Sequence, residues 1–251
     1  MTDALLSVEN ISKRFGGLRA VDQASFAVMP GRITALIGPN GAGKTTLFSI
    51  VSGFLRPDAG RILYAGADIT GEPPHKLARR GIARTFQIVQ PFAGLTVCEN
   101  IAVGSHLSRP RRADALAAAA EVAQSVGLGS QRDQPAAALT VAGRKRLELA
   151  RALATAPKLL LLDEVLAGLN PSEIRDMVPV IRDIASRGVT ILMIEHVMQA
   201  VMSLAAHVFV LAEGRIIAEG APQQIAADKR VIEAYLGHGA ASRMAAGAGR
   251  G

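Results

Sequence analysis

A glycine-rich segment holds the residues of this chain whose types and spacing are best suited to chemistry. The segment reads Gly38-Pro39-Asn40-Gly41-Ala42-Gly43-Lys44-Thr45 and matches the pattern G-x-x-x-x-G-K-[ST]. Glycines allow the backbone to curl tightly around an anion, because other residues resist a positive φ. Backbone N–H groups, and the positive end of the helix that follows, would then bind phosphate oxygens. The spacing therefore predicts a loop that binds the phosphates of a nucleotide.

Three side chains at the end of this loop have separate predicted roles. Lys44 should reach the β- and γ-phosphates, the Thr45 hydroxyl should hold Mg²⁺, and Thr46 can add a hydroxyl near the α-phosphate. The apolar run RITALIG before the loop predicts a strand, and KTTLFSIVSG after it predicts a helix that ends at Gly53.

Two adjacent acids follow the apolar run LLLL, which has the composition of a buried parallel strand. Asp163 and Glu164 would thus lie at the carboxyl end of that strand, where open α/β sheets bind ligands. Because neighbouring strand residues point to opposite sides, the two carboxylates should do different jobs. Asp163 is suited to bind Mg²⁺ through water near Thr45, and Glu164 to polarise the water that attacks the γ-phosphate.

A second apolar strand, TILMIEH, ends at His196. A neutral imidazole there could donate to the γ-phosphate and hold the attacking water in line, although a lone histidine at a strand end is more often structural. Gln87, after GIARTF, carries little weight by itself because glutamine is common on protein surfaces.

Composition limits the possible classes of protein. The 251 residues include 28 Lys and Arg against 21 Asp and Glu, so the chain carries a charge of +7. A basic surface of this size could bind nucleic acid, a lipid headgroup or a phosphorylated ligand, or it is simply solvated. The absence of Trp argues against a stacking platform for single-stranded nucleic acid. One cysteine, Cys98, excludes an internal disulfide and fits a reducing compartment. The segment between Glu195 and Glu213 predicts a helix over 198–205 and a strand over 207–211, not a membrane span.

The remaining patterns predict an α/β protein of one large domain, or of a domain with a lobe. Alternating residues over 6–28 indicate antiparallel strands, and HVFVLAEGRIIAEG indicates a hairpin that turns at Glu213-Gly214. Residues 113–126 and 144–155 favour helices, and the scarcity of strand character between Ile88 and Leu139 marks an inserted helical lobe. The last fifteen residues include ten Gly or Ala and are expected to be disordered.

Taken together, these motifs resemble the ATP-binding subunits of ABC transporters, over residues 6 to about 236. The segments LSVENISKRFGGLRAV, GIARTFQ, LTVCENIAVG, DEVLAGLNPSE and VIEAYLG are most similar to the ATPases of branched-chain amino-acid importers. The resemblance implies a P-loop NTPase core, with a mixed sheet and an N-terminal antiparallel part. It also implies an ABC ATPase domain over 1–236, a helical subdomain inserted at about 88–140, and a disordered tail over 237–251.

The resemblance further implies ATP and Mg²⁺ as cofactors, and it assigns roles to residues. Glu164 and His196 would be catalytic, and Gln87 would join Thr45 and Asp163 at the metal. Phe15 stands where the family stacks an aromatic ring on adenine, although an apolar residue packed under a strand is an equal interpretation.

The signature region departs from the family pattern L-S-G-G-Q, since this chain has Leu139-Thr140-Val141-Ala142-Gly143. In this family the region completes the nucleotide site of a second subunit. The resemblance therefore assigns contacts in trans to Thr140, Ala142 and Gly143, ahead of a helix expected to start near Arg144.

The function implied is that of an ATP-hydrolysing subunit that couples ATP binding and hydrolysis to uptake of branched-chain or related amino acids. The alternatives are the same role for urea, an amide or another solute, and a soluble ABC ATPase outside transport. The implied partners are a second ABC ATPase subunit, identical or a paralogue, two transmembrane permease subunits and, indirectly, a solute-binding protein, but no nucleic acid. The implied location is cytoplasmic, at the inner face of the cell membrane through the permeases.

Overall fold

The computed structural model of the chain describes residues 4–86 and 90–236. The predictions for Gln87 and for the tail 237–251 lie outside these residues. The strands are β1 (Leu6–Phe15), β2 (Leu18–Val28), β3 (Ile33–Ile37), β4 (Ala59–Tyr64), β5 (Ala67–Asp68), β6 (Ile82–Arg84), β7 (Leu159–Asp163), β8 (Thr190–Ile194), β9 (His207–Ala212) and β10 (Arg215–Gly220). The helices are α1 (Lys44–Val51), α2 (Pro74–Arg79), α3 (Val97–Ser105), α4 (Arg112–Ser125), α5 (Val141–Leu153), α6 (Pro171–Ser186), α7 (Met198–Leu204), α8 (Pro222–Ala227) and α9 (Lys229–Leu236), with 3-10 turns at Gly129–Gln131 and Ala136–Ala138.

Two sheets form the centre of the molecule. The larger has six strands in the order β10-β9-β3-β8-β7-β6, and the smaller has four strands in the order β2-β1-β4-β5. Strands β9, β3, β8, β7 and β6 run parallel, whereas β10 and all pairs in the smaller sheet are antiparallel. The predicted α/β class, with a mixed sheet and an N-terminal antiparallel part, is confirmed.

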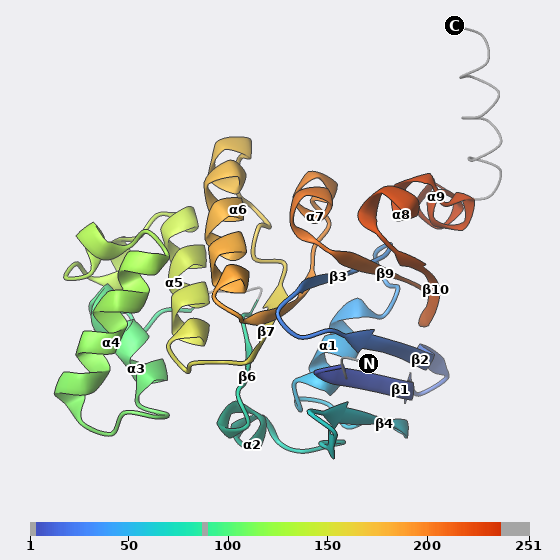
Figure 1. Cartoon of the computed structure of the whole chain (residues 1–251), viewed down its shortest axis with the longest axis horizontal. Coiled ribbons are helices and arrows are strands. Elements are labelled where there is room, and N and C mark those ends of the chain that lie inside the picture. Colours follow the sequence, from blue (N-terminus) through green and yellow to red (C-terminus); the bar gives the residue numbers. More distant parts are fainter. Residues whose placement is uncertain (1–3, 87–89, 237–251) are drawn as a thin grey trace, which may run out of the picture.

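The alternation of side chains along the central strands divides the core in two. Leu36, Leu161 and Leu192 join the side chains of α1 and of the smaller sheet in one cluster, so α1 packs between the sheets. Ala35 and Leu160 point the other way, into a cluster that α6, α7 and α8 cover (Figure 1). Both faces of these strands are buried, which explains why their sequences read as continuous apolar runs.

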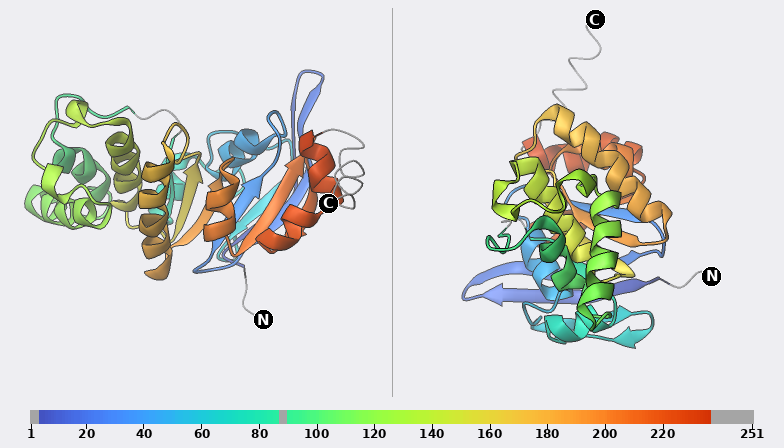
Figure 2. Two further views of the ribbon diagram at one scale, coloured as in Figure 1. Left: turned by 90° about the horizontal axis from the view of Figure 1, so that it is seen from above. Right: turned by 90° about the vertical axis from the view of Figure 1, so that its left-hand side faces the viewer.

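A group of helices extends from one end of the core, opposite to α8 and α9 (Figure 2). Here α3 packs on α4 and on α5. Thr96 begins α3 with a capping box, in which its hydroxyl accepts from the Glu99 N–H and the Glu99 carboxylate accepts from the Thr96 N–H. Along the alanine-rich α4, Ala115, Ala119 and Ala123 are fully buried, because only small side chains fit where the helices approach closely.

Two element boundaries differ from the sequence predictions. Helix α5 begins at Val141 rather than near Arg144, because the Thr140 hydroxyl caps it by accepting from the Gly143 N–H at 3.1 Å. Strand β8 ends at Ile194, so His196 lies two residues beyond the strand rather than at its end. The predicted hairpin turn at Glu213-Gly214 is confirmed, with φ of 48° and 80° at the two residues.

Within 4–86 and 90–236, no helix combines the length and apolarity that crossing a bilayer requires.

Candidate nucleotide-binding site

The glycine-rich loop joins β3 to α1, as predicted. Gly38 has φ of 153° and Gly43 has φ of 102°, values that side-chain-bearing residues rarely adopt. A Cβ atom at Gly38 would lie 2.0 Å from the Leu211 carbonyl oxygen, and one at Gly43 would lie 2.2 Å from the Ala20 carbonyl oxygen. Both positions therefore require glycine, because the loop is pressed against the β9 end and the β2 strand.

Lys44 is the buried cation of the loop. Its side chain bends back so that Nζ donates to the Gly38 carbonyl at 2.8 Å and to the Pro39 carbonyl at 2.9 Å. Burial lowers the pKa of Lys44, and the negative charge of Glu164 opposes that shift. The ammonium group thus lies over the loop, where phosphate oxygens would replace the carbonyl oxygens as acceptors.

A cleft of about 550 Å³ opens over the loop. It is lined by residues 40–46 of the loop and the start of α1, by Phe15 and Leu18 from β1 and β2, and by Glu164 and Glu213. No acidic residue lies in the first turn of α1 and no side chain caps it, so the positive end of the helix is not neutralised by a group of its own first turn. The arrangement is suited to a phosphorylated ligand.

Phe15 lies at the mouth of this cleft. Half of its surface is exposed, and the neighbouring Leu18 is 69% exposed. The ring is therefore not packed under a strand, and its free face could stack on a flat aromatic ligand.

The two acids after β7 occupy different surroundings. Asp163 is the last strand residue and is 5% exposed, whereas Glu164 has left the strand with φ of 49° and lines the cleft. The expectation that strand alternation separates them is wrong, because alternation stops at Asp163 and a turn directs Glu164. The Glu164 N–H donates to the Ile194 carbonyl at 3.0 Å, which fixes this turn against β8.

An arginine that the sequence analysis did not single out holds Asp163. Nη2 of Arg84, in β6, lies 2.7 Å from the Asp163 carboxylate. The signal was present in GIARTFQ, but a lone arginine there gives no hint of its partner without the pairing of β6 with β7.

The other predicted residues lie outside the cleft of this chain. His196 is exposed beyond β8 and does not line the cleft. Thr140, Ala142 and Gly143 form the N-terminus of α5, which the structure also places away from the cleft lining. No cluster of three or more His, Cys, Asp or Glu side chains with metal-binding geometry occurs in the described part of the chain.

Glu195 is a second residue that the sequence analysis missed. Its side chain is buried between β8 and the loop after β7, where Oε1 accepts from the Leu166 N–H at 2.9 Å. Among the residues that the structure describes, Oε2 finds no hydrogen-bond partner. Burial, reinforced by the charge of Glu164, raises the pKa of Glu195 from 4.5 to about 7. The Glu195 carboxyl group thus lies beneath the loop that carries Glu164.

We expect Glu195→Gln to change how stability depends on pH. Between pH 4.5 and about 7 the folded chain keeps a Glu195 proton that the unfolded chain releases, so this residue makes wild-type stability fall as pH rises and stop falling above about 7. Glutamine keeps the acceptor for the Leu166 N–H and removes the titration. The free energy of unfolding of the variant, relative to that of wild type, should therefore rise by up to about 3 kcal/mol from pH 5 to pH 8.

Denaturant unfolding at several pH values measures this shift. Glu121→Gln, at an exposed position of α4, serves as the matched control and should show no such trend. Parallel stability curves for wild type and Glu195→Gln would contradict the buried, proton-binding state of Glu195.

Comparison with known proteins places these features in a family. The model of the ABC transporter family matches residues 21–167, and that of the branched-chain amino acid ATP-binding cassette transporter matches residues 215–241. The chain is 40% identical to the high-affinity branched-chain amino acid transport ATP-binding protein LivG of Escherichia coli, over 94% of this chain and 99% of that protein. Identity to BraF of Pseudomonas aeruginosa, which carries the same description, is 39% over the same shares.

A solved structure supports the same assignment. The ADP conformation of an ATP-binding cassette of an ABC transporter superposes with a TM-score of 0.86 and 34% identity, covering 94% of this chain and all of that one. The fold, the loop and these relatives agree, and the chain belongs to the ABC transporter family as one of its ATP-hydrolysing subunits.

Proposed function

We propose that this chain binds and hydrolyses ATP as the motor subunit of an importer for branched-chain or related amino acids. The observation that carries the ATPase role is the cleft in which the phosphate-binding loop, Lys44 and Glu164 come together. The type of solute rests on the relatives, whose descriptions name branched-chain amino acid transport. In this proposal residues 1–236 form one ATPase domain, with the helical lobe at about 88–140 inserted into it.

ATP binding is assigned to groups already in place around the cleft. The loop N–H groups and the start of α1 would hold the phosphates, with Lys44 at the β- and γ-phosphates and Thr46 near the α-phosphate. Phe15 would stack on adenine with its exposed face.

A carboxylate and a hydroxyl are donors that Mg²⁺ prefers, and Asp163 and Thr45 provide this pair at the ends of β7 and of the loop. We assign the ion to these two residues, together with Gln87, which lies outside the described residues. When bound, Mg²⁺ would neutralise the charge that develops on the phosphate oxygens.

Hydrolysis is assigned to Glu164, whose carboxylate would accept the proton of the attacking water. Its position depends on the turn that the Ile194 carbonyl holds in place. His196 would reach the γ-phosphate only when the segment after β8 approaches the cleft, since it is exposed here.

The cleft is open on one side, and the N-terminus of α5 is the surface that would cover it in a second subunit. Thr140 is exposed there, no acid lies in the first turn of α5, and the helix end is positive. We therefore propose a two-fold dimer, with a copy or a paralogue, in which two ATP molecules lie at the interface.

Glu164→Gln tests the catalytic assignment. The amide cannot accept the proton, so hydrolysis should fall by at least about 100-fold, while ATP still binds and the dimer no longer opens. Size-exclusion chromatography with ATP should then show a stable dimer, and Glu121→Gln should behave as wild type. Wild-type turnover by Glu164→Gln would contradict the assignment.

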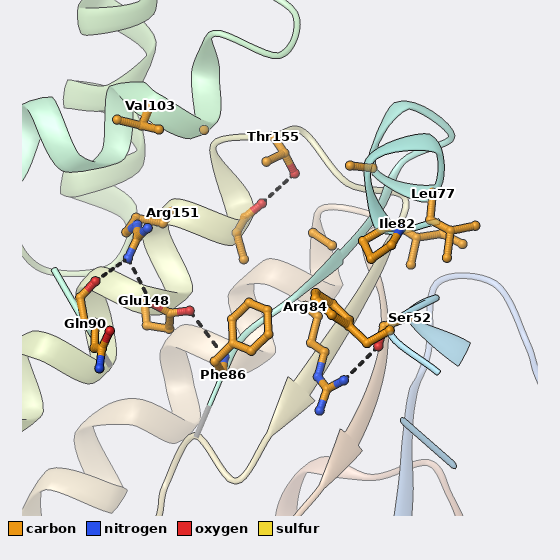
Figure 3. A pocket seen from close by; sticks show the side chains of 16 residues that line it. Ser52, Leu77, Ile82, Arg84, Phe86, Gln90, Val103, Glu148, Arg151 and Thr155 are labelled. Carbon is orange, nitrogen blue, oxygen red and sulfur yellow. Dashed lines mark hydrogen bonds and ion pairs between the residues drawn. The ribbon is translucent and has the colours of Figure 1, made fainter. Parts of the chain in front are cut away.

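A groove of about 450 Å³ between α2, β6, α3 and α5 is the proposed contact with the membrane subunits (Figure 3). Its surface is mainly apolar and is lined by Phe54, Leu77, Phe86 and Val103, together with the charged Glu148 and Arg151. The half-exposed rings of Phe54 and Phe86 and the exposed Val103 form an apolar surface suited to the apolar side of a permease helix. This contact would hold the chain at the inner face of the membrane.

Val103→Glu tests this contact. A charge in the groove would have to be desolvated on docking, so co-purification with the permease subunits should drop at least about tenfold, while ATP binding by the free chain stays unchanged. Leu107→Glu, on the exposed end of the same helical region but outside the groove, is the matched control. Equal recovery of both variants with the permeases would show that the groove is not the contact with the membrane subunits.

A further inference from the structure

The carboxylate assigned to Mg²⁺ is engaged by an arginine. The pair between Arg84 and Asp163 is buried, with side chains 9% and 6% exposed and 2.7 Å between Nη2 and Oδ2. The two residues sit on the neighbouring strands β6 and β7, so the sheet itself brings them together. A positive charge at this distance neutralises Asp163 and weakens its attraction for a cation.

Arg84 also contacts the helix that follows the phosphate-binding loop. Its Nη1 donates to the Ser52 hydroxyl at 2.8 Å and to the Ser49 hydroxyl at 3.3 Å. Its Nε is buried and has no acceptor among the described residues. The two terminal nitrogens of the guanidinium thus have hydroxyl and carboxylate acceptors, whereas the Nε donor has none in this position.

Aromatic rings hold the guanidinium from the side of the groove. Its central carbon lies 5.7 Å from the Phe54 ring centroid and 5.6 Å from that of Phe86, both within reach of a cation–π contact. The two rings meet edge to face at 5.5 Å, and both are half-exposed residues that line the groove. Arg84 therefore lies between the groove and Asp163.

We propose that Arg84 is a positioning residue that competes with Mg²⁺ for Asp163, and that a partner seated in the groove releases it by displacing Phe54 and Phe86. The second half rests on the proposed docking of a permease helix, whereas the first concerns the free chain alone. Because a guanidinium does not lose its proton in proteins, Arg84 keeps its charge and the pair is released by movement of Arg84.

Nucleotide affinity with and without Mg²⁺ tests the competition. The dissociation constant of ADP is measured by calorimetry on the full chain in Mg²⁺ and in EDTA, and the value in EDTA divided by the value in Mg²⁺ reports the contribution of the ion. Arg84→Gln should raise that ratio about tenfold, equivalent to about 1.4 kcal/mol. Arg80→Gln, which breaks a surface ion pair with Glu72 at the end of α2, is the matched control and should leave the ratio unchanged.

A second variant covers loss of folding, because Arg84→Gln leaves a buried carboxylate without its partner. Phe54→Leu removes one ring from the guanidinium at a half-exposed position and keeps Arg84 in the chain. It should shift the ratio in the same direction by a smaller factor, with an unchanged circular dichroism spectrum. An unchanged or lower ratio in every folded variant would overturn the proposed competition with Mg²⁺. Arg84 would then have only a structural role, in joining β6 to α1.

The link to the groove is tested in the assembled complex. With the permeases bound, the ratio for the wild-type chain should rise to that of the free Arg84→Gln variant. A ratio that stays at the free-chain value although the complex forms would overturn the release step. Failure of the complex to form would instead contradict the proposed docking, and the measurements on the free chain would still decide the competition.

Discussion

Close approach between the phosphate-binding loop and its neighbours is the constraint on which the rest of the structure depends. Gly38 lies against the Leu211 carbonyl and Gly43 against the Ala20 carbonyl, so the loop is clamped between the two sheets. Lys44 closes it from within through the Gly38 and Pro39 carbonyls. Helix α1 then starts in a fixed direction and packs between the sheets. A shift of either sheet would change the shape of the site that receives the phosphates.

Buried polar side chains connect this site to more distant parts of the chain. Asp163 is paired with Arg84, which contacts the ring of Phe54 in the groove. Glu195, just after β8, accepts a hydrogen bond from Leu166 in the loop that carries Glu164. A buried ion pair or hydrogen bond is favourable only while both partners stay in place, so each contact ties the positions of the elements that it joins. The two contacts link the groove and the segment after β8 to elements around the nucleotide cleft.

The sequence was sufficient to predict the elements that carry strong local signals. The loop, the apolar strand before Asp163 and the hairpin turn at Glu213 were placed correctly, because glycine spacing and apolar runs are local properties. The alternation of strand side chains does not explain the direction of Glu164. That direction depends on a positive φ and on a hydrogen bond to Ile194 of β8, which is remote in sequence. Arg84 and Glu195 were missed for the same reason, because their roles arise from strand pairing and burial. The roles of the individual site residues, those of His196 and Thr140 among them, stay predictions.

Binding of a nucleotide by the loop and Lys44 is the central requirement of the proposed function. Calorimetric titration of ATP with Mg²⁺ into wild type and Lys44→Ala tests it most directly, with the exposed Lys229→Ala as control. One nucleotide should bind per chain, and Lys44→Ala should weaken binding by roughly 100-fold, since charge-assisted hydrogen bonds to phosphate are lost. Equal affinity of Lys44→Ala and wild type, or no binding by either protein, would contradict the account.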